Sequence, residues 1–85
     1  MTYRVAFERA AEKELLALPT LVRERIVSAL KKLARDPFAA ASVKSLKGGI
    51  YRLRVGDYRV LYSSKNETLV VLAVKVGHRR VVYRD

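Results

Sequence analysis

The sequence predicts a single α+β domain in which an N-terminal helical hairpin packs on one face of a twisted, mainly antiparallel sheet of four or five strands. Three observations lead to this prediction. Apolar residues recur at helical spacing in residues 8–35, alternate with basic residues in residues 50–62, and are almost continuous in residues 69–76. The length of 85 residues suits one domain, which we place over residues 1–85.

The N-terminal region is expected to form a strand followed by a helix. Residues 2–7 alternate between an apolar and a more polar face, which predicts a short first strand. A helix is expected from Glu8 to Leu18, because apolar residues recur at helical spacing and glutamates lie toward its start, where the helix dipole favours them. Pro19 is expected to end this helix.

A second helix is expected to begin with Thr20 as its N-cap and to run to about Arg35. Asp36 and Pro37 should stop it, because proline disfavours helix at the residue before it. The short link between the helices predicts an antiparallel hairpin that covers one face of a sheet. The apolar stripe of the second helix consists of Val22, Ile26, Ala29, Leu30 and Leu33.

The segment from Phe38 to Gly49 is predicted to be a loop. Its Lys44 and Lys47 precede a basic hairpin in the sequence, and its glycine pair permits a sharp entry into the next strand. Two interpretations of the lysines remain open: a solvated, flexible loop, or contacts with phosphate.

Residues 50–62, IYRLRVGDYRVLY, predict a β-hairpin whose turn is Gly56-Asp57. A glycine in the first central position is typical of a type II′ turn. A two-residue turn also sets the register, because the paired residues step outward together. The expected pairs are Val55 with Tyr58, Arg54 with Arg59, Leu53 with Val60 and Arg52 with Leu61.

This register gives the hairpin one apolar and one basic face. Arg52, Arg54 and Arg59 share the basic face, and like charges directly opposite each other destabilise a sheet. A bound anion would compensate for this repulsion, although a merely solvated face is the alternative. The apolar face is expected to contain Tyr51, Leu53, Val55, Tyr58, Val60 and Tyr62.

The C-terminal third is expected to hold a central strand and a tail. Residues 63–67 should form a turn, and the apolar run of residues 69–76 predicts a strand that is buried on both faces for most of its length. Gly77 should end this strand. The tail, residues 78–85, then offers a last short strand or an extended edge.

Composition limits the classes of function. The net charge of +10 favours a polyanionic partner, nucleic acid above all, although charge can also serve solubility alone. The chain has no cysteine and a single histidine, His78, so we expect no disulfide, metal or cofactor. No apolar run approaches the roughly 18 to 20 residues that span a bilayer, and we expect a cytoplasmic protein without membrane contact.

The order of these features resembles the RelE/ParE superfamily of bacterial and archaeal toxins. Two motifs carry the resemblance, which covers essentially the whole chain: YRLRVGDYRVLY at residues 51–62 and VGHRRVVY at residues 76–83. In the RelE branch, the toxin enters the ribosomal A site and cuts messenger RNA without a metal. The ParE branch poisons DNA gyrase and generally lacks the full set of site residues.

The resemblance implies a set of site residues. By position, Arg54, Arg59, Arg79 and Tyr83 are implied as catalytic, with Arg59 as the phosphate-binding arginine and Arg79 as the stabiliser of the leaving group. It also implies a cognate antitoxin, which could dock on the helices or cover the basic face. The residues expected to contact RNA are Lys44, Lys47, Arg52, His78 and Arg80.

The group that takes the proton is the weak point of this assignment. Well-known RelE-like toxins have lysines where this chain has Arg52 and Arg54, and an arginine stays charged at any working pH. His78 and Tyr83 are therefore the candidates for proton transfer. The alternatives are that His78 only caps the turn after the central strand and that Tyr83 only packs at an edge or stacks on a base.

The resemblance therefore implies a type II toxin that is a ribosome-dependent endoribonuclease and cleaves messenger RNA by 2′-hydroxyl attack without a metal. Two other functions could follow from the same residues. The first is a ParE-like inhibitor of DNA gyrase, which would act by binding protein. The second is a non-catalytic RNA-binding module or a degenerate toxin, which the missing lysines make credible.

Overall fold

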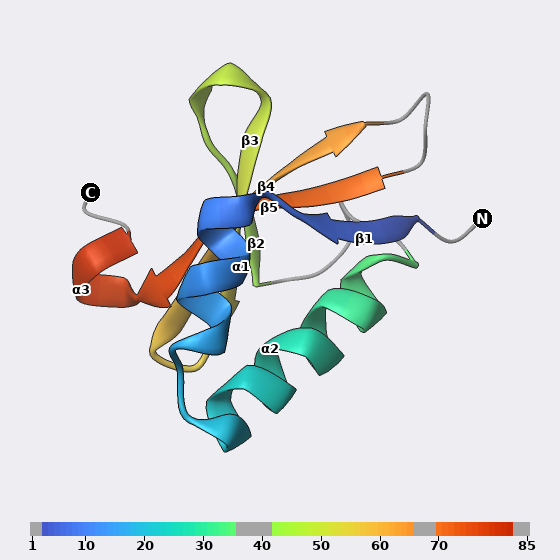
Figure 1. Cartoon of the computed structure of the whole chain (residues 1–85). Coiled ribbons are helices and arrows are strands. Elements are labelled where there is room, and N and C mark those ends of the chain that lie inside the picture. The colour runs from blue at the N-terminus through green and yellow to red at the C-terminus, as the bar shows by residue number, and fades with distance from the viewer. Residues whose placement is uncertain (1–2, 36–41, 66–69, 83–85) are drawn as a thin grey trace.

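The computed structural model describes residues 3–35, 42–65 and 70–82, with only the backbone described at positions 65 and 82. Figure 1 shows a helical layer against a twisted sheet. The elements in chain order are β1 (Arg4–Phe7), α1 (Arg9–Leu16), α2 (Thr20–Leu33), β2 (Val43–Ser45), a 3₁₀ turn (Lys47–Gly49), β3 (Ile50–Val55), β4 (Tyr58–Lys65), β5 (Val70–His78) and α3 (Arg79–Val82).

The five strands form one mixed sheet in the order β1-β5-β4-β3-β2. Strand β1 pairs with β5 in parallel, and the other three pairings are antiparallel. This arrangement confirms the predicted fold class. Strand β4 is the middle strand; β3 and β2 continue the sheet to one edge, and β5 and β1 continue it to the other (Figure 1).

The core lies between the two long helices and one face of the sheet. Helix α1 contributes Ala11 and Leu15, and α2 contributes Ile26, Leu30 and Leu33, as their helical spacing predicts. Full burial of such side chains contributes about 1.5 to 3 kcal/mol each. The sheet side of this cluster consists of Leu53, Val60, Tyr62, Val71, Ala73 and Val76.

The helices are shorter than the sequence predicts. Helix α1 ends at Leu16 rather than at Leu18, and α2 ends at Leu33 rather than near Arg35. At its other end α2 begins one residue earlier than predicted, because its N-cap is Pro19 rather than Thr20. The guanidinium of Arg23 donates to the carbonyl of Leu16 at 3.3 Å, so α2 itself satisfies a terminal carbonyl of α1. No helix among the described residues is long and apolar enough to cross a membrane.

Two segments predicted as turn or loop contain strand. The predicted loop over residues 38–49 includes β2, a three-residue edge strand that pairs with β3, and the 3₁₀ turn. Strand β4 continues to Lys65, so the predicted turn over residues 63–67 begins too early. Both differences arise because pairing with a neighbouring strand overrides weak local sequence signals.

Strand β5 differs most from its prediction. It runs to His78 through Gly77, which was expected to end it. The paired residues step from Leu61 with Lys75 to Tyr62 with Ala73, so β5 has an extra residue, Val74, and the sides of its later residues are reversed. Complete burial is limited to Val71, Ala73 and Val76, so the prediction of burial on both faces is only partly correct.

Helix α1 binds the part of β5 that extends past its pairing with β1. The Glu14 carboxylate accepts a hydrogen bond from the backbone N–H of Val76 at 3.0 Å and pairs with the Lys75 ammonium at 2.9 Å. Strand β1 pairs only with residues 70–73 of β5, so Glu14 serves a backbone donor that β1 does not reach.

The tail forms a helix instead of the predicted strand or extended edge. Helix α3 begins at Arg79, whose backbone N–H donates to the carbonyl of Asp57 at 2.8 Å. The backbone N–H of Arg80 donates to Nδ1 of His78 at 3.2 Å. These two contacts turn the chain at the end of β5 and outweigh the β preference of the valines that follow.

Candidate functional site

The β3–β4 hairpin has the turn and the register that its sequence predicts. Gly56 has a φ of +59°, a conformation that favours glycine, and all four predicted pairs are present. Leu53 and Val60 are buried toward the helices, so the alternating residues Arg52, Arg54 and Arg59 belong to the opposite side of the sheet. We call this side the arginine face.

Arg59 is the most constrained cation of the arginine face. It is only 9% exposed, and its Nη1 donates to the carbonyls of Gly56 at 2.8 Å and of Tyr58 at 2.9 Å. These two backbone carbonyls partly offset the repulsion among the arginines, for which the sequence suggests a bound anion as compensation. These contacts also fix the guanidinium, because both partners belong to the hairpin turn or lie directly beside it.

The electrostatic surroundings of Arg59 are strongly positive. Burial lowers the pKa of Arg59, as do the charges of Arg52, Arg54 and Arg79, and only the Asp57 carboxylate raises it. An arginine still keeps its charge at any physiological pH. Four guanidiniums therefore share one neighbourhood, where a phosphate would be attracted to all of them.

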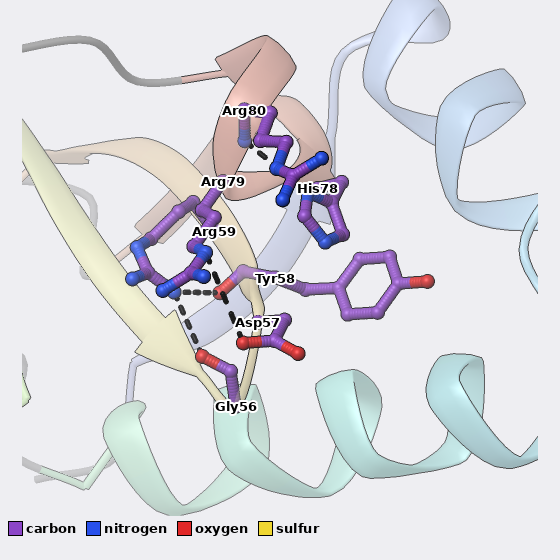
Figure 2. Close-up of polar contacts among 7 residues, drawn as sticks. All are labelled: Gly56, Asp57, Tyr58, Arg59, His78, Arg79 and Arg80. Atoms are coloured by element: carbon purple, nitrogen blue, oxygen red, sulfur yellow. Dashed lines mark hydrogen bonds and ion pairs between the residues drawn. The ribbon is translucent and has the colours of Figure 1, made fainter.

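Arg79 reaches the hairpin from the far end of β5. Gly77 pairs with Arg59 across the sheet, and the backbone hydrogen bond to Asp57 places Arg79 beside the turn. Its Nε lies 3.9 Å from Oδ1 of Asp57. Figure 2 shows the Arg79 and Arg59 side chains on the same side of the turn, so the two sequence motifs combine into one site.

His78 lies on the opposite side of the sheet from the arginine face. It pairs with Tyr58, which packs against the core, and the two rings meet edge to face with centroids 5.5 Å apart (Figure 2). Its Nδ1 accepts the Arg80 N–H, so the neutral ring carries its proton on Nε2. The bulge at Val74 determines on which side of the sheet His78 lies. A bulge leaves no clear signal in a continuous apolar run of sequence.

The other predicted site residues are spread more widely. Lys44 lies on β2 directly opposite Arg52, which places its exposed side chain on the arginine face. Lys47 is exposed in the 3₁₀ turn, and Arg80 is exposed on α3. In Figure 2 the Arg80 side chain extends beside His78 rather than beside Arg59. Tyr83 lies outside the described residues.

Asp57 is the site residue that sequence reasoning missed. The sequence predicts only a turn at the Gly-Asp pair, yet the backbone and carboxylate of Asp57 both contact Arg79. Its place between Arg54 and Arg59 in the sequence was the available signal. The described residues contain no group of three or more His, Asp or Glu side chains that could hold a metal ion.

The fold and this cluster define a class of small basic α+β proteins in which a helix pair covers one face of a sheet and arginines gather on its other face. The family model described as "ParE toxin of type II toxin-antitoxin system, parDE" matches residues 5–83. The chain belongs to the RelE/ParE superfamily, the toxins of type II toxin–antitoxin systems, as its sequence motifs predict.

Individual relatives agree with this assignment. Toxin RelG of Mycobacterium tuberculosis is 31% identical over 99% of both chains, and a putative RelE-like toxin of Escherichia coli is 30% identical over 93% of this chain and 85% of its own length. The toxin–antitoxin complex RelBE2 of M. tuberculosis contains a chain with 31% identity and a TM-score of 0.81, covering 93% of this chain and 100% of that one.

An archaeal relative is equally similar in structure. The RelE–RelB complex of Pyrococcus horikoshii contains a chain with 32% identity and a TM-score of 0.82, covering 96% of this chain and 100% of that one. Both solved neighbours are complexes with an antitoxin.

Proposed function

We propose that this toxin is a metal-independent endoribonuclease that cuts messenger RNA on the ribosome. The observation that carries the proposal is the gathering of Arg52, Arg54, Arg59 and Arg79 around one place beside the hairpin turn. An exposed row of cations would serve general RNA binding equally well. A nearly buried arginine with fixed geometry suits the more demanding task of stabilising a transition state.

The proposed reaction is an internal transfer of the phosphate ester. The 2′-oxygen of the RNA attacks the adjacent phosphorus, the bond from phosphorus to the 5′-oxygen breaks, and a 2′,3′-cyclic phosphate and a 5′-hydroxyl result. The 2′-hydroxyl loses a proton and the leaving oxygen gains one. Negative charge grows on the nonbridging and leaving oxygens, so fixed guanidiniums stabilise the transition state more than the ground state.

The arginines divide this work according to their places. Arg59 and its cross-strand neighbour Arg54 would hold the nonbridging oxygens, because a planar guanidinium can bind phosphate through two N–H groups. Each hydrogen bond to a charged partner contributes about 1.5 to 3 kcal/mol. Arg79, beside the turn, would stabilise the leaving 5′-oxygen. Arg52 and Lys44 would bind the neighbouring backbone of the RNA.

The proposed proton-transfer group is Tyr83. His78 faces the helical side of the sheet and its Nδ1 is occupied by a backbone N–H, so its better supported role is to cap α3. Arg52 and Arg54 cannot act as bases near neutral pH. Tyr83 follows α3 by one residue and could exchange a proton or stack on a base.

The proposed partners are the ribosome and a cognate antitoxin in the cytoplasm. The solved neighbours that are complexes with RelB support the second partner. The net charge of +10 favours both RNA and an acidic segment of antitoxin.

The proposal is tested by adding purified protein to ribosomes that translate a defined message. We expect cuts within the A-site codon, suppressed by Arg59→Ala and by Arg79→Ala. Mass spectrometry should find a 2′,3′-cyclic phosphate at the new 3′ end and a 5′-hydroxyl at the new 5′ end of the message. An intact message with folded wild-type protein would refute the nuclease.

A second candidate function is inhibition of DNA gyrase. The ParE description of the matching family model favours it. Supercoiling of relaxed plasmid by purified gyrase decides the matter, and the nuclease proposal predicts no inhibition. Inhibition that Arg59→Ala leaves intact, together with an intact message, would favour the gyrase inhibitor. RNA binding with neither activity would identify a non-catalytic or degenerate toxin.

A further inference from the structure

Asp57 is an anomaly in the distribution of charge. The other carboxylates among the described residues belong to the helical layer, where they lie at Glu8, Glu12, Glu14 and Glu24. Asp57 instead lies at the tip of the hairpin, next to the four guanidiniums that surround the proposed site. A negative charge there weakens the attraction of a phosphate, so its presence calls for an offsetting function.

Asp57 contacts Arg79 in two separate ways. Its backbone carbonyl accepts the Arg79 N–H at 2.8 Å and holds the start of α3 against the turn. Its carboxylate Oδ1 lies 3.9 Å from Nε of Arg79, with both side chains more than half exposed. The backbone contact fixes where the Arg79 side chain starts, and the carboxylate acts on the direction in which its guanidinium points. A substitution of the side chain removes only the second effect.

The geometry leaves one edge of the Arg79 guanidinium available. The carboxylate approaches from the Nε side, so the Nη groups can face away from Asp57 on the side of the turn where Arg59 lies (Figure 2). There they could bind a phosphate together with Arg59. A long exposed arginine without such a partner samples many rotamers, and few of them bring its fork to a leaving oxygen.

We propose that Asp57 is a positioning residue that orients Arg79 for the cleavage step, and that it does so at the expense of RNA affinity. This inference rests on the proposed ribonuclease function. It implies that loss of the Asp57 charge has opposite effects on two measurements: RNA binds more tightly because a repulsive charge is gone, and bound RNA is cut more slowly because Arg79 is no longer oriented. A residue that only supports folding would change both in the same direction.

The test compares Asp57→Asn with Glu24→Gln, which removes the same unit of charge from the exposed surface of α2. The first measurement uses the free protein: the side-chain Nε–Hε NMR signal of Arg79, assigned by its loss in Arg79→Lys. We expect Asp57→Asn to shift this signal and Glu24→Gln to leave it in place. An unshifted signal in Asp57→Asn would overturn the proposal.

The second and third measurements separate binding from chemistry. For a short single-stranded 2′-O-methyl RNA, which cannot be cut, Asp57→Asn should lower Kd by about two- to fivefold. In single-turnover cleavage on saturating ribosome complexes, its rate should fall by about three- to tenfold. Glu24→Gln should change each value by less than about 1.5-fold, because an exposed charge on the helical side of the sheet is screened by salt.

The outcomes also separate this inference from the proposed function. If the wild-type protein cuts no RNA, the ribonuclease fails, while the NMR signal and the Kd still decide whether Asp57 orients Arg79 and repels RNA. If the wild-type protein cuts and Asp57→Asn cuts at the same rate, the ribonuclease stands and the positioning role falls. Parallel losses of affinity and rate would assign Asp57 a purely structural role.

Discussion

The two faces of the β3–β4 hairpin are built from alternate residues of the same strands, yet they are stabilised in different ways. On the helical side, Leu53, Val60 and Tyr62 are at most 3% exposed and owe their place to the removal of apolar surface from water. On the arginine face, Arg54 lies directly opposite Arg59, and the two carbonyls that bind Arg59 offset only part of their repulsion. The helical side therefore stabilises the fold, whereas the like charges on the arginine face destabilise it.

The largest expected effect is that of Arg59 on RNA cleavage. Arg59→Ala removes the most buried guanidinium of the site, and we expect the single-turnover rate to fall by about 100-fold or more, as for other fixed donors to a transition state. Arg59→Lys keeps the charge without the planar fork and should recover only part of the rate. A folded Arg59→Ala protein with wild-type activity would show that the arginine face is not the site.

The comparison of the faces is most direct at two consecutive residues of β3. Leu53→Ala should lower the free energy of unfolding by about 2 to 5 kcal/mol, measured with urea, with little change in cleavage per folded molecule. Arg54→Ala should change stability by less than about 0.5 kcal/mol and reduce cleavage by about tenfold. The reverse pattern would mean that the two faces have been assigned incorrectly.

The burial of Tyr62 on the helical side should appear in the pH dependence of the stability. Burial, with a contribution from Tyr51, raises the pKa of Tyr62, so between about pH 10 and that raised value the folded protein binds a proton that the unfolded chain has lost. Stability therefore falls as pH rises, by up to about 1.4 kcal/mol per pH unit. Tyr62→Phe should remove this part of the slope above pH 10, and identical slopes would contradict it.

A smaller effect is expected for His78 than for Arg79, although the two are neighbours in sequence. His78→Ala removes the acceptor for the Arg80 N–H on the helical side, and we expect it to slow cleavage by less than about threefold. Its pH–rate profile between about pH 5 and 8 should match that of the wild type. Arg79→Ala should slow the reaction by about 30-fold or more. An altered profile in His78→Ala would make His78 a proton-transfer group.

The smallest effect is expected at the edge of the arginine face. Lys44→Ala should weaken binding of single-stranded RNA by about two- to threefold and lower the salt dependence by roughly one phosphate contact. Lys44→Arg should bind like the wild type, because it keeps the charge opposite Arg52. If Lys44→Arg bound normally but lost most of its cleavage rate, Lys44 would transfer a proton rather than merely bind.

The hairpin was predictable because its determinants are local. The Gly-Asp pair defines a two-residue turn, the turn defines the register, and alternation then assigns Arg54 and Leu53 to opposite faces. The apolar stripes of the helices and the fold class were predictable for the same reason. The resemblance to a toxin family added the proposed role of Arg79, which no local pattern contains.

The remaining features depend on contacts between distant residues. The bulge at Val74 requires both neighbours of β5, and it reverses the side on which His78 lies. Helix α3 forms where valines favour a strand, because Asp57 and His78 bind its first N–H groups. Strand β2 has only three residues and gains its form by pairing with β3. In each case the residues that determine the structure lie outside the segment, so the sequence of the segment alone does not predict it.

The parallel pairing of β1 with β5 has a consequence for the synthesis of the chain. Residues near position 4 pair with residues near position 70, so the first strand to be made must wait for the last strand of the sheet. Such long-range closure is entropically costly and comes late in folding. The same strand carries Arg79 to the hairpin. A nascent chain can therefore complete its cluster of four arginines only after β5 has been synthesised.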